Sequence, residues 1–204
     1  MKYFFLFLIL LLMSGCSPKL RQSFTKVSKP EKTWVFFHPF KAKKAFLITK
    51  EVEKTVDSLR IEKTIGGDIN GGHLDAFKHS FWMVQLTHGI GKNAAYRLGK
   101  AHEKGNYQTF KKRKREDGIF ADKPSSEMDM FNNLIGISIG ENNHKRIKKI
   151  LIQQVLDSLR QGKLKIVSKD SLGNFLDCNR NVIPLDSLRH RWETKKCLVP
   201  SNEK

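Results

Sequence analysis

The chain has 204 residues, of which 39% are hydrophobic, and a formal net charge of +18 at pH 7. It contains no internal repeat and no low-complexity block, and this excludes repeat arrays. The positive charge favours an anionic partner such as lipid head groups or acidic wall polymer.

Residues 1–15 have the pattern of a secretory signal. Lys2 supplies a positive charge, and residues 3–13 form an apolar run of eleven. Such a run is too short to cross a membrane as a stable helix. We therefore expect a signal peptide that is removed on export.

The end of this segment, residues 13–16, resembles the bacterial lipobox, with Met13 where Leu is usual. The resemblance implies that Cys16 is lipidated and becomes the new N-terminus, and two or more acyl chains would hold the exported protein to a bacterial membrane. Ser17, rather than Asp, follows Cys16. This favours the outer membrane, facing the periplasm, in a diderm cell. The alternative is an ordinary signal peptide with a chance cysteine.

Residues 16–30 are polar, basic and without periodicity, so we expect a tether. Residues 31–204 then form a single domain of about 170 residues, enough to bury a core. Its first segment, residues 34–40, is aromatic; core packing is the favoured interpretation and contact with a membrane surface is the alternative.

Apolar residues with the helical period of about 3.6 predict a series of helices separated by glycines. One helix is expected to end near Gly105, and another to open at residues 124–126 with Ser126 and Asp129 as an approximate capping box. The first expected helix begins at Pro39 and is broken by the glycine-rich residues 66–72. The others span residues 73–87 and 92–104, open at residues 124–126, and span residues 143–160.

Beyond residue 163 the pattern changes. Residues 164–167 and 174–177 flank a Gly-containing turn and predict a small hairpin, and residues 184–188 predict a short helix or turn. The fold class is therefore mainly α, a single helical domain with a small C-terminal β-hairpin. Cys178 and Cys197 are the expected disulfide pair in an oxidising compartment, with two unpaired thiols as the alternative.

Candidate site residues gather in residues 66–140, where four of the seven histidines lie between 73 and 102. Asp75 and His79 are four residues apart, so both lie on one face of their helix. The carboxylate could orient the imidazole as a general base, or both could ligate one metal ion.

Two further helices carry groups of this kind. His102 and Glu103 are adjacent and point about 100° apart, so one of them is expected to face the site. Asp129 and Asn133 share one polar stripe with Gly136, whose small size would let another helix or a ligand approach closely.

Each cluster also has a purely structural interpretation. An Asp/His pair four residues apart is often a surface contact worth a few tenths of a kcal/mol. A polar stripe is usually the solvent face of its helix, and an aspartate near a helix start is explained by capping. Three successive helices that each bring such groups favour a common site.

Residues 70–82, 101–103 and 128–136 together resemble an uncharacterised bacterial domain family. Its members carry patterns such as Asp-Ala-Phe-Arg-His-x-x-Trp, Asp-Ala-His-Glu and Met-Asp-Leu-x-Asn-Asn-x-x-Gly-Arg, and they are exported or surface-associated. The resemblance implies the fold and the location of the site. This chain departs from the patterns at Lys78, Lys100 and Ile137.

One hypothesis is a membrane-anchored hydrolase that acts on an anionic envelope substrate. The rival is a non-catalytic lipoprotein in which the same groups form a hydrogen-bonded packing network. A third is a binder of anionic lipid or wall polymer through Lys111–Arg115, for which a solvated loop is the default; no nucleic-acid partner is expected. The hydrolase hypothesis assigns catalysis to Asp75, His79 and Asn133 and a divalent metal to His102, Glu103 and Asp129.

Overall fold

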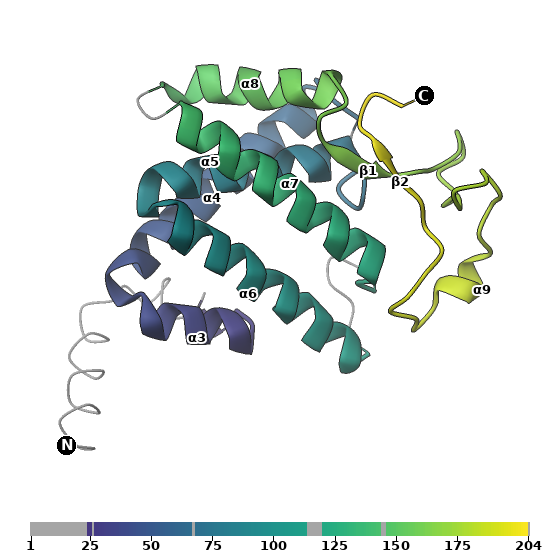
Figure 1. Cartoon of the computed structure of the whole chain (residues 1–204), viewed down its shortest axis with the longest axis horizontal. Coiled ribbons are helices and arrows are strands. Elements are labelled where there is room, and N and C mark those ends of the chain that lie inside the picture. The colour runs from purple at the N-terminus through teal and green to yellow at the C-terminus, as the bar shows by residue number, and fades with distance from the viewer. Residues whose placement is uncertain (1–23, 26, 67, 114–119, 144–145, 204) are drawn as a thin grey trace.

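The computed structural model describes residues 24–25, 27–66, 68–113, 120–143 and 146–203. The expected signal peptide, Cys16 and the first part of the tether lie outside the described residues. Within them, the chain is a helical body with one small antiparallel sheet near the C-terminus (Figure 1), which confirms the predicted fold class. None of the described helices combines the length and hydrophobicity needed to cross a membrane.

The elements follow one another in a simple order. The helices are α3 (Lys29–Phe37), α4 (Pro39–Ile61), α5 (His73–Ile90), α6 (Lys92–Lys111), α7 (Lys123–Asn142), α8 (Lys148–Arg160) and α9 (Leu185–Leu188). The strands are β1 (Lys165–Val167), which follows α8, and β2 (Leu198–Pro200), which follows α9.

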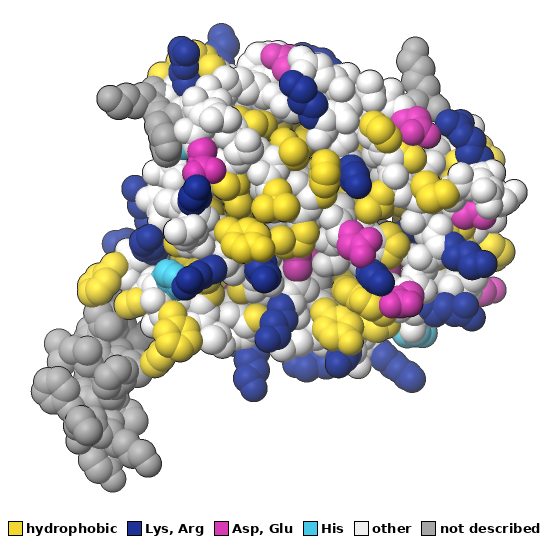
Figure 2. Space-filling model, in the orientation of Figure 1, with side chains coloured by type: hydrophobic (Ala, Val, Ile, Leu, Met, Phe, Trp, Pro, Cys, Tyr) yellow, Lys and Arg dark blue, Asp and Glu magenta, His cyan; other side chains and the backbone are white. Residues whose placement is uncertain are grey.

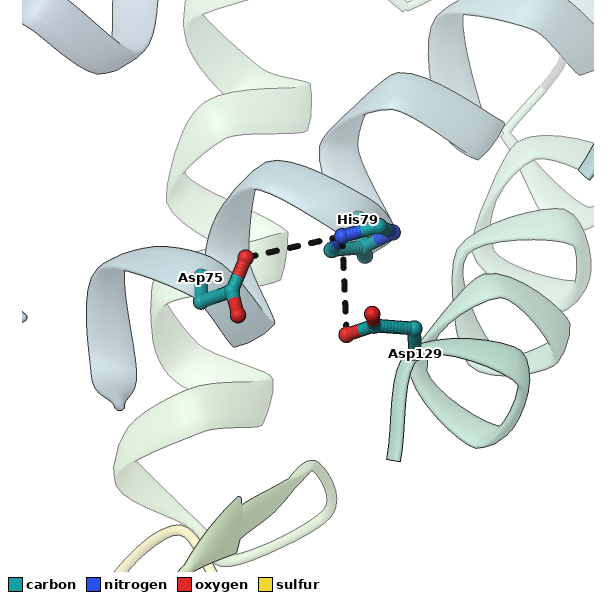
Figure 3. Close-up of side chains that lie close together, drawn as sticks. All are labelled: Asp75, His79 and Asp129. Carbon is teal, nitrogen blue, oxygen red and sulfur yellow. Dashed lines mark ion pairs between the residues drawn. The ribbon is translucent and has the colours of Figure 1, made fainter. Parts of the chain in front are cut away.

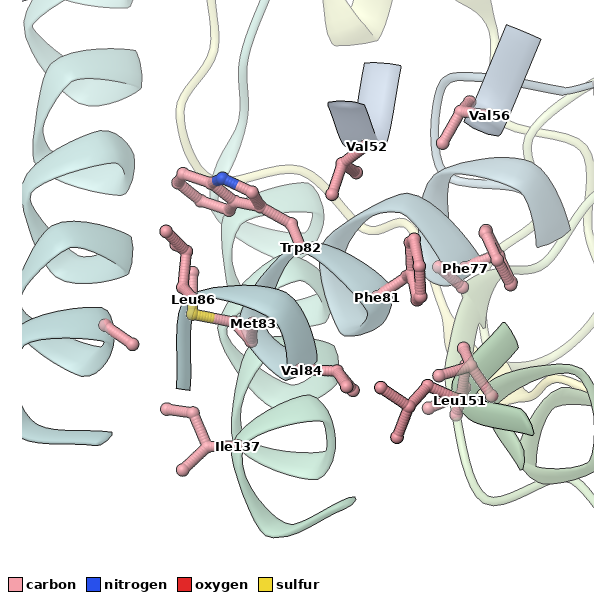
Figure 4. Packing of buried hydrophobic residues seen from close by; sticks show 14 of the residues in the cluster. Val52, Val56, Phe77, Phe81, Trp82, Met83, Val84, Leu86, Ile137 and Leu151 are labelled. Atoms are coloured by element: carbon pink, nitrogen blue, oxygen red, sulfur yellow. The ribbon is translucent and has the colours of Figure 1, made fainter. Parts of the chain in front are cut away.

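Helix α5 is the centre of the body and contacts α4, α6, α7 and α8. It is apolar on most of its circumference, the pattern expected of a helix surrounded by others. Phe77, Phe81 and Met83 have no exposed surface, and Figure 4 shows them packed with Leu151 of α8 and Ile137 of α7. The polar residues of α5 are therefore held in a rigid setting.

Helices α5 and α7 approach closely because glycines of α7 face α5. A Cβ atom at Gly136 would collide with the carbonyl of Ser80, and one at Gly140 would lie 2.9 Å from Thr87. The Ser80 hydroxyl donates a hydrogen bond of 3.0 Å to the carbonyl of Asn132 across this contact. The expectation that Gly136 permits close helix packing is confirmed.

Helix α6 does not end at Gly105, as expected from the sequence, but continues to Lys111. A Cβ atom at Gly105 would collide with the hydroxyl of Ser28. This glycine therefore permits close packing instead of terminating the helix. Ser28 itself caps α3, so residues 28–30, which the sequence places in the tether, belong to the folded domain.

Two other helix starts also differ from expectation. Helix α7 is capped by Asp122, whose carboxylate accepts a 3.0 Å hydrogen bond from the Ser125 amide. Ser126 is inside the helix and does not cap it. Helix α8 begins at Lys148, because Asn143 is the C-terminal cap of α7.

The expected hairpin is only partly right. Strand β1 pairs with β2 in antiparallel register, Ile166 opposite Val199, and not with residues 174–177. The predicted turn does form, but it closes with a single bridge between Lys169 and Phe175. The structure joins Cys178 to Cys197, which directly precedes β2. Residues 168–197, which connect the two strands, are thus held by the β1–β2 pairing and by the disulfide.

Candidate functional site

Asp75 and His79 of α5 meet Asp129 of α7 at one point (Figure 3). The His79 Nε2 atom lies 3.5 Å from Asp75 Oδ1 and 3.5 Å from Asp129 Oδ1. Asp75 arrives there because it is one helical turn before His79. Asp129 arrives because the glycine-mediated contact brings α7 against α5.

All three side chains are nearly enclosed, with exposed fractions of 11% for Asp75, 6% for His79 and 10% for Asp129. Burial raises the pKa of Asp75, but the hydrogen bond and charge of His79, the charge of Lys78 and the Gly71 amide outweigh it, so the pKa lies below its ordinary value. The Gly71 amide donates to Asp75 Oδ2 at 2.8 Å. Asp75 is therefore held as a carboxylate.

The three residues provide a donor set that could hold a metal ion. Each offers one ligand atom, and these atoms lie within 4.8 Å of one another. Imidazole nitrogen with carboxylate oxygen suits zinc and other divalent transition metals, and three protein ligands leave a coordination position for water. The metal ligands expected from the sequence, His102, Glu103 and Asp129, do not come together in this way.

His102 instead pairs with Glu31 of α3. Its Nδ1 atom lies 3.1 Å from Glu31 Oε1, while Glu31 Oε2 accepts a 2.8 Å hydrogen bond from the Ser28 amide. Burial raises the pKa of Glu31, but the hydrogen bond and charge of His102, together with the bonds from Ser28, lower it to about 2. Both carboxylate oxygens of Glu31 are thus engaged.

This pair stands beside the Asp75–His79–Asp129 group. The imidazole rings of His102 and His79 are 6.1 Å apart between centroids, and the Trp82 ring lies 5.5 Å from that of His102. Glu31 is not among the site residues expected from the sequence. The Ser28-x-x-Glu31 spacing of a capping box marks it as the third residue of a helix, but not as a partner of His102.

Glu103 points in a different direction from His102, as their adjacency predicts. Its Oε2 atom accepts a 2.8 Å hydrogen bond from the Ser126 hydroxyl and one of 3.4 Å from the Asn106 amide. The first of these bonds ties α6 to α7. Glu103 therefore supports the wall of the site and takes no part in the Asp75–His79–Asp129 group.

Asn133 lies apart from the site. Its side chain is buried beside Gly99, where a Cβ atom would lie 3.2 Å from Asn133 Nδ2, and it does not line the pocket described below. Its neighbour Asn132 exchanges two 2.9 Å hydrogen bonds with the backbone of Lys165. The polar residues of α7 thus have separate roles: Asp129 contacts His79, Asn132 binds the backbone of Lys165, and Asn133 is buried away from the pocket.

A pocket of about 780 Å³ opens beside both imidazoles, a volume in the range of small-molecule sites. Helices α3 and α4 supply an apolar wall. Lys43, Lys50 and Lys78 also line the pocket. Lys196 lines it from the C-terminal segment and forms a buried ion pair of 2.7 Å with Asp122. The apolar wall includes Trp34, Val35, Ala42, Phe46 and Val52.

Comparison with known families gives a match to a domain of unknown function, DUF6973, over residues 32–163. The matched range begins within α3 and ends just after α8. It contains the whole Asp75–His79–Asp129 group and His102, but not Glu31. The searches of curated proteins and of solved structures give no match.

Proposed function

The chain belongs to the DUF6973 family, and we propose from its site that it is a metal-assisted hydrolase held at a membrane. The observation that carries the proposal is the approach of two buried carboxylates to one imidazole nitrogen, each at 3.5 Å. This group lines a pocket large enough for a substrate.

In this proposal Asp75, His79 and Asp129 hold one divalent metal ion. The ion would lower the pKa of a bound water and polarise the scissile group. Asp75 is held in place for the role by the Gly71 amide, which donates a 2.8 Å hydrogen bond to its Oδ2 atom and leaves Oδ1 facing His79. This assignment changes His79 from the general base expected from the sequence to a ligand.

The role of general base then passes to His102. With Nδ1–H donating to Glu31, the deprotonated form of the ring would present Nε2 as a proton acceptor. A carboxylate that fixes the tautomer of a histidine in this way is a recurrent arrangement in hydrolases. His102 lines the same pocket as the metal ligands, close enough to act on water bound there.

The pocket favours an anionic substrate. Lys43, Lys50 and Lys78 line it, and the whole chain carries a net charge of +18. Carboxylates line the pocket as well, among them Glu31, Glu53 and Asp75, so the preference is drawn from the positive charge of the whole chain, which attracts anions. A phosphate-bearing compound of the cell envelope fits both this charge and the proposed location.

The competing function is a packing network without catalysis. It is favoured by the burial of Asp75, His79 and Asp129, since buried charged groups are usually paired for structural reasons. If a protonated His79 bridges two carboxylates, loss of the imidazole leaves those charges unpaired and destabilises the fold by several kcal/mol.

One variant separates the two functions. Metal analysis of the purified protein is compared with that of His79→Ala, and hydrolysis of bis(p-nitrophenyl) phosphate and p-nitrophenyl acetate is assayed in both. The hydrolase predicts bound divalent metal and hydrolytic activity in the wild type, and loss of both in His79→Ala. A large loss of stability with no metal in the wild type would favour the packing network. Glu127→Gln, an exposed change on α7, is the control.

Membrane attachment is proposed through a lipidated Cys16 after removal of residues 1–15, with the folded domain exported and the outer membrane favoured in a diderm cell. The test is incorporation of radiolabelled palmitate in a bacterial host. Label is expected in the wild type and not in Cys16→Ala. Equal incorporation in the two would contradict the proposal.

A second contact with anionic lipid or wall polymer is proposed for the basic run Lys111–Arg115. Residues 111–113 are exposed, and Lys114 and Arg115 lie outside the described residues. Such a contact weakens with salt, because mobile ions screen exposed charges. Retention on a cation-exchange column should fall when the run is neutralised, and it should fall less for each charge removed when Lys148 and Lys149 are neutralised instead.

A further inference from the structure

Three phenyl groups project from the junction of α3 and α4. Phe36, Phe37 and Phe40 have exposed fractions of 53%, 71% and 92%. Figure 2 shows hydrophobic side chains standing out at the lower left, where Figure 1 places this junction. Single exposed apolar residues are common, but three large ones within five positions form a patch that calls for a partner.

The three rings are not part of the core, because Trp34 is the aromatic residue of α3 that faces inward. Trp34 is 5% exposed, and its indole Nε1 donates a 3.1 Å hydrogen bond to the carbonyl of Ala94. Phe36 and Phe37 follow on the outward side and contact each other edge to face at 5.3 Å. The aromatic segment is therefore divided between the core and the surface.

The charges around the patch have one sign. Residues 32–50 contain five lysines and no aspartate or glutamate. Lys41, Lys43 and Lys44 follow directly after Phe40 and are exposed. Exposed aromatic rings beside lysines are typical of segments that lie in the interface of an anionic bilayer.

We propose that the α3–α4 junction, residues 36–44, is a docking edge that inserts Phe36, Phe37 and Phe40 into the interface of an anionic lipid bilayer. The position of the chain favours a bilayer over other occupants. Cys16, the proposed lipid anchor, lies only thirteen residues before the first residue of α3, so a bilayer would be within reach of this edge.

Docking in this way would orient the pocket. Trp34 and Val35 of α3 and Phe46 of α4 line the pocket, and they belong to the same two helices as the docking edge. The pocket wall would therefore lie against the bilayer. This inference rests on the proposed membrane attachment but not on hydrolysis, and its test does not use activity.

The experiment uses the full chain purified from membranes and reconstituted into vesicles of phosphatidylglycerol and phosphatidylcholine that carry a nitroxide-labelled lipid. A fluorophore is attached at Phe40→Cys or, as the matched control, at Leu185→Cys of α9, which is 64% exposed and also apolar. Helix α9 lies at the opposite side of the molecule in Figure 1. Wild-type chain treated with the same reagent measures any label on Cys16, and flotation confirms attachment to the vesicles.

We expect quenching of at least about twofold at position 40 and little at position 185, because only the docking edge enters the lipid. Quenching at position 40 should weaken when phosphatidylglycerol is omitted. It should also weaken in Phe36→Ser/Phe37→Ser, whose changes are on exposed side chains and leave the core intact.

Several results would overturn the proposal. One is absence of vesicle binding, and another is bound chain with no quenching at position 40. Equal quenching at positions 40 and 185 would mean that the folded domain rotates freely on its tether and has no docking edge. Quenching that Phe36→Ser/Phe37→Ser leaves unchanged would remove the role of the rings. Self-quenching of the label at position 40 that grows with protein concentration without lipid would identify a second copy of the chain as the occupant.

Discussion

The two carboxylate–imidazole groups of the pocket contain the same kinds of side chain but differ in geometry. The Nδ1 atom of His102 lies 3.1 Å from a carboxylate oxygen of Glu31. The Nε2 atom of His79 faces two carboxylates, Asp75 and Asp129, each at 3.5 Å. The first distance is that of a hydrogen bond, whereas the second pair is longer than most hydrogen bonds and surrounds one nitrogen atom.

The difference lies in how each carboxylate is used. Glu31 has a partner for both oxygens, Ser28 and His102, so its interactions are satisfied within the protein. At His79, two carboxylates face one nitrogen, and their repulsion requires a positive charge between them, either a proton or a metal ion. The Glu31–His102 pair is thus complete, and the Asp75–His79–Asp129 group is suited to hold a cation.

The largest expected effect comes from Asp129→Asn, which removes one ligand charge with little change of shape. Affinity for Zn²⁺ or Mn²⁺, measured by titration calorimetry, should fall by on the order of 100-fold or more. Glu31→Gln should leave the affinity nearly unchanged. Equal losses in the two variants would remove the distinction between the two groups.

The next effect is on catalysis. His102→Asn should lower kcat by on the order of 100-fold, the usual contribution of a general base, while the bound metal content stays at the wild-type level. Steady-state kinetics with bis(p-nitrophenyl) phosphate and metal analysis of the same sample measure both quantities. Metal loss in His102→Asn would instead assign His102 to the metal centre.

A bound metal should also stabilise the fold. At a free metal concentration of about 100 Kd, the free energy of unfolding should rise by about 2.7 kcal/mol. For a domain of this size that corresponds to a Tm increase of roughly 5–10 °C. Scanning calorimetry should show this increase in the wild type and in Glu31→Gln, and its absence in Asp75→Asn. A Tm increase that persists in Asp75→Asn would place the ion elsewhere.

The smallest effect is the acid sensitivity of the Glu31–His102 pair. The pKa of Glu31 is lowered from 4.5 to about 2 in the folded protein. A depressed carboxylate pKa stabilises the fold above the ordinary pKa, and this stabilisation is lost as pH falls toward the lowered value. Glu31→Gln should therefore be less stable than the wild type by on the order of 1–3 kcal/mol at pH 6.

Urea unfolding at a series of pH values measures this difference. The wild-type and Glu31→Gln curves should converge between about pH 4.5 and pH 2, the interval between the ordinary and the lowered pKa. A difference in stability that does not depend on pH would mean that Glu31 acts through packing or capping instead of through its charge.

Local patterns in the sequence predict much of this structure. The helical period places α4 and α5 correctly, and the four-residue spacing of Asp75 and His79 predicts that they share a face. The expectation that Asp129 joins them depends on a tertiary contact, and the glycines of α7 provide the sequence signal for it.

Pairings between distant segments are not predictable in this way. His102 and Glu31 are 71 positions apart, and nothing in either local sequence specifies the other. Likewise, β1 has a turn close by that favours a local hairpin, yet it pairs with β2 beyond a disulfide-closed loop. Gly105 is read as a helix terminator because its contact with Ser28 exists only in the folded domain.

The C-terminal segment has a consequence for selectivity. Phe175 and Lys196 complete the pocket, yet both lie beyond residue 163, where the family match ends. The Lys196 ammonium lies 3.9 Å from the centroid of the Phe175 ring, and the neighbouring Cys197 is cross-linked to Cys178. A relative that retained α3–α8 but carried a different C-terminal segment would keep the same reactive groups and present a different pocket lining. The disulfide-closed C-terminal segment is therefore where substrate specificity could change without disturbing the helices.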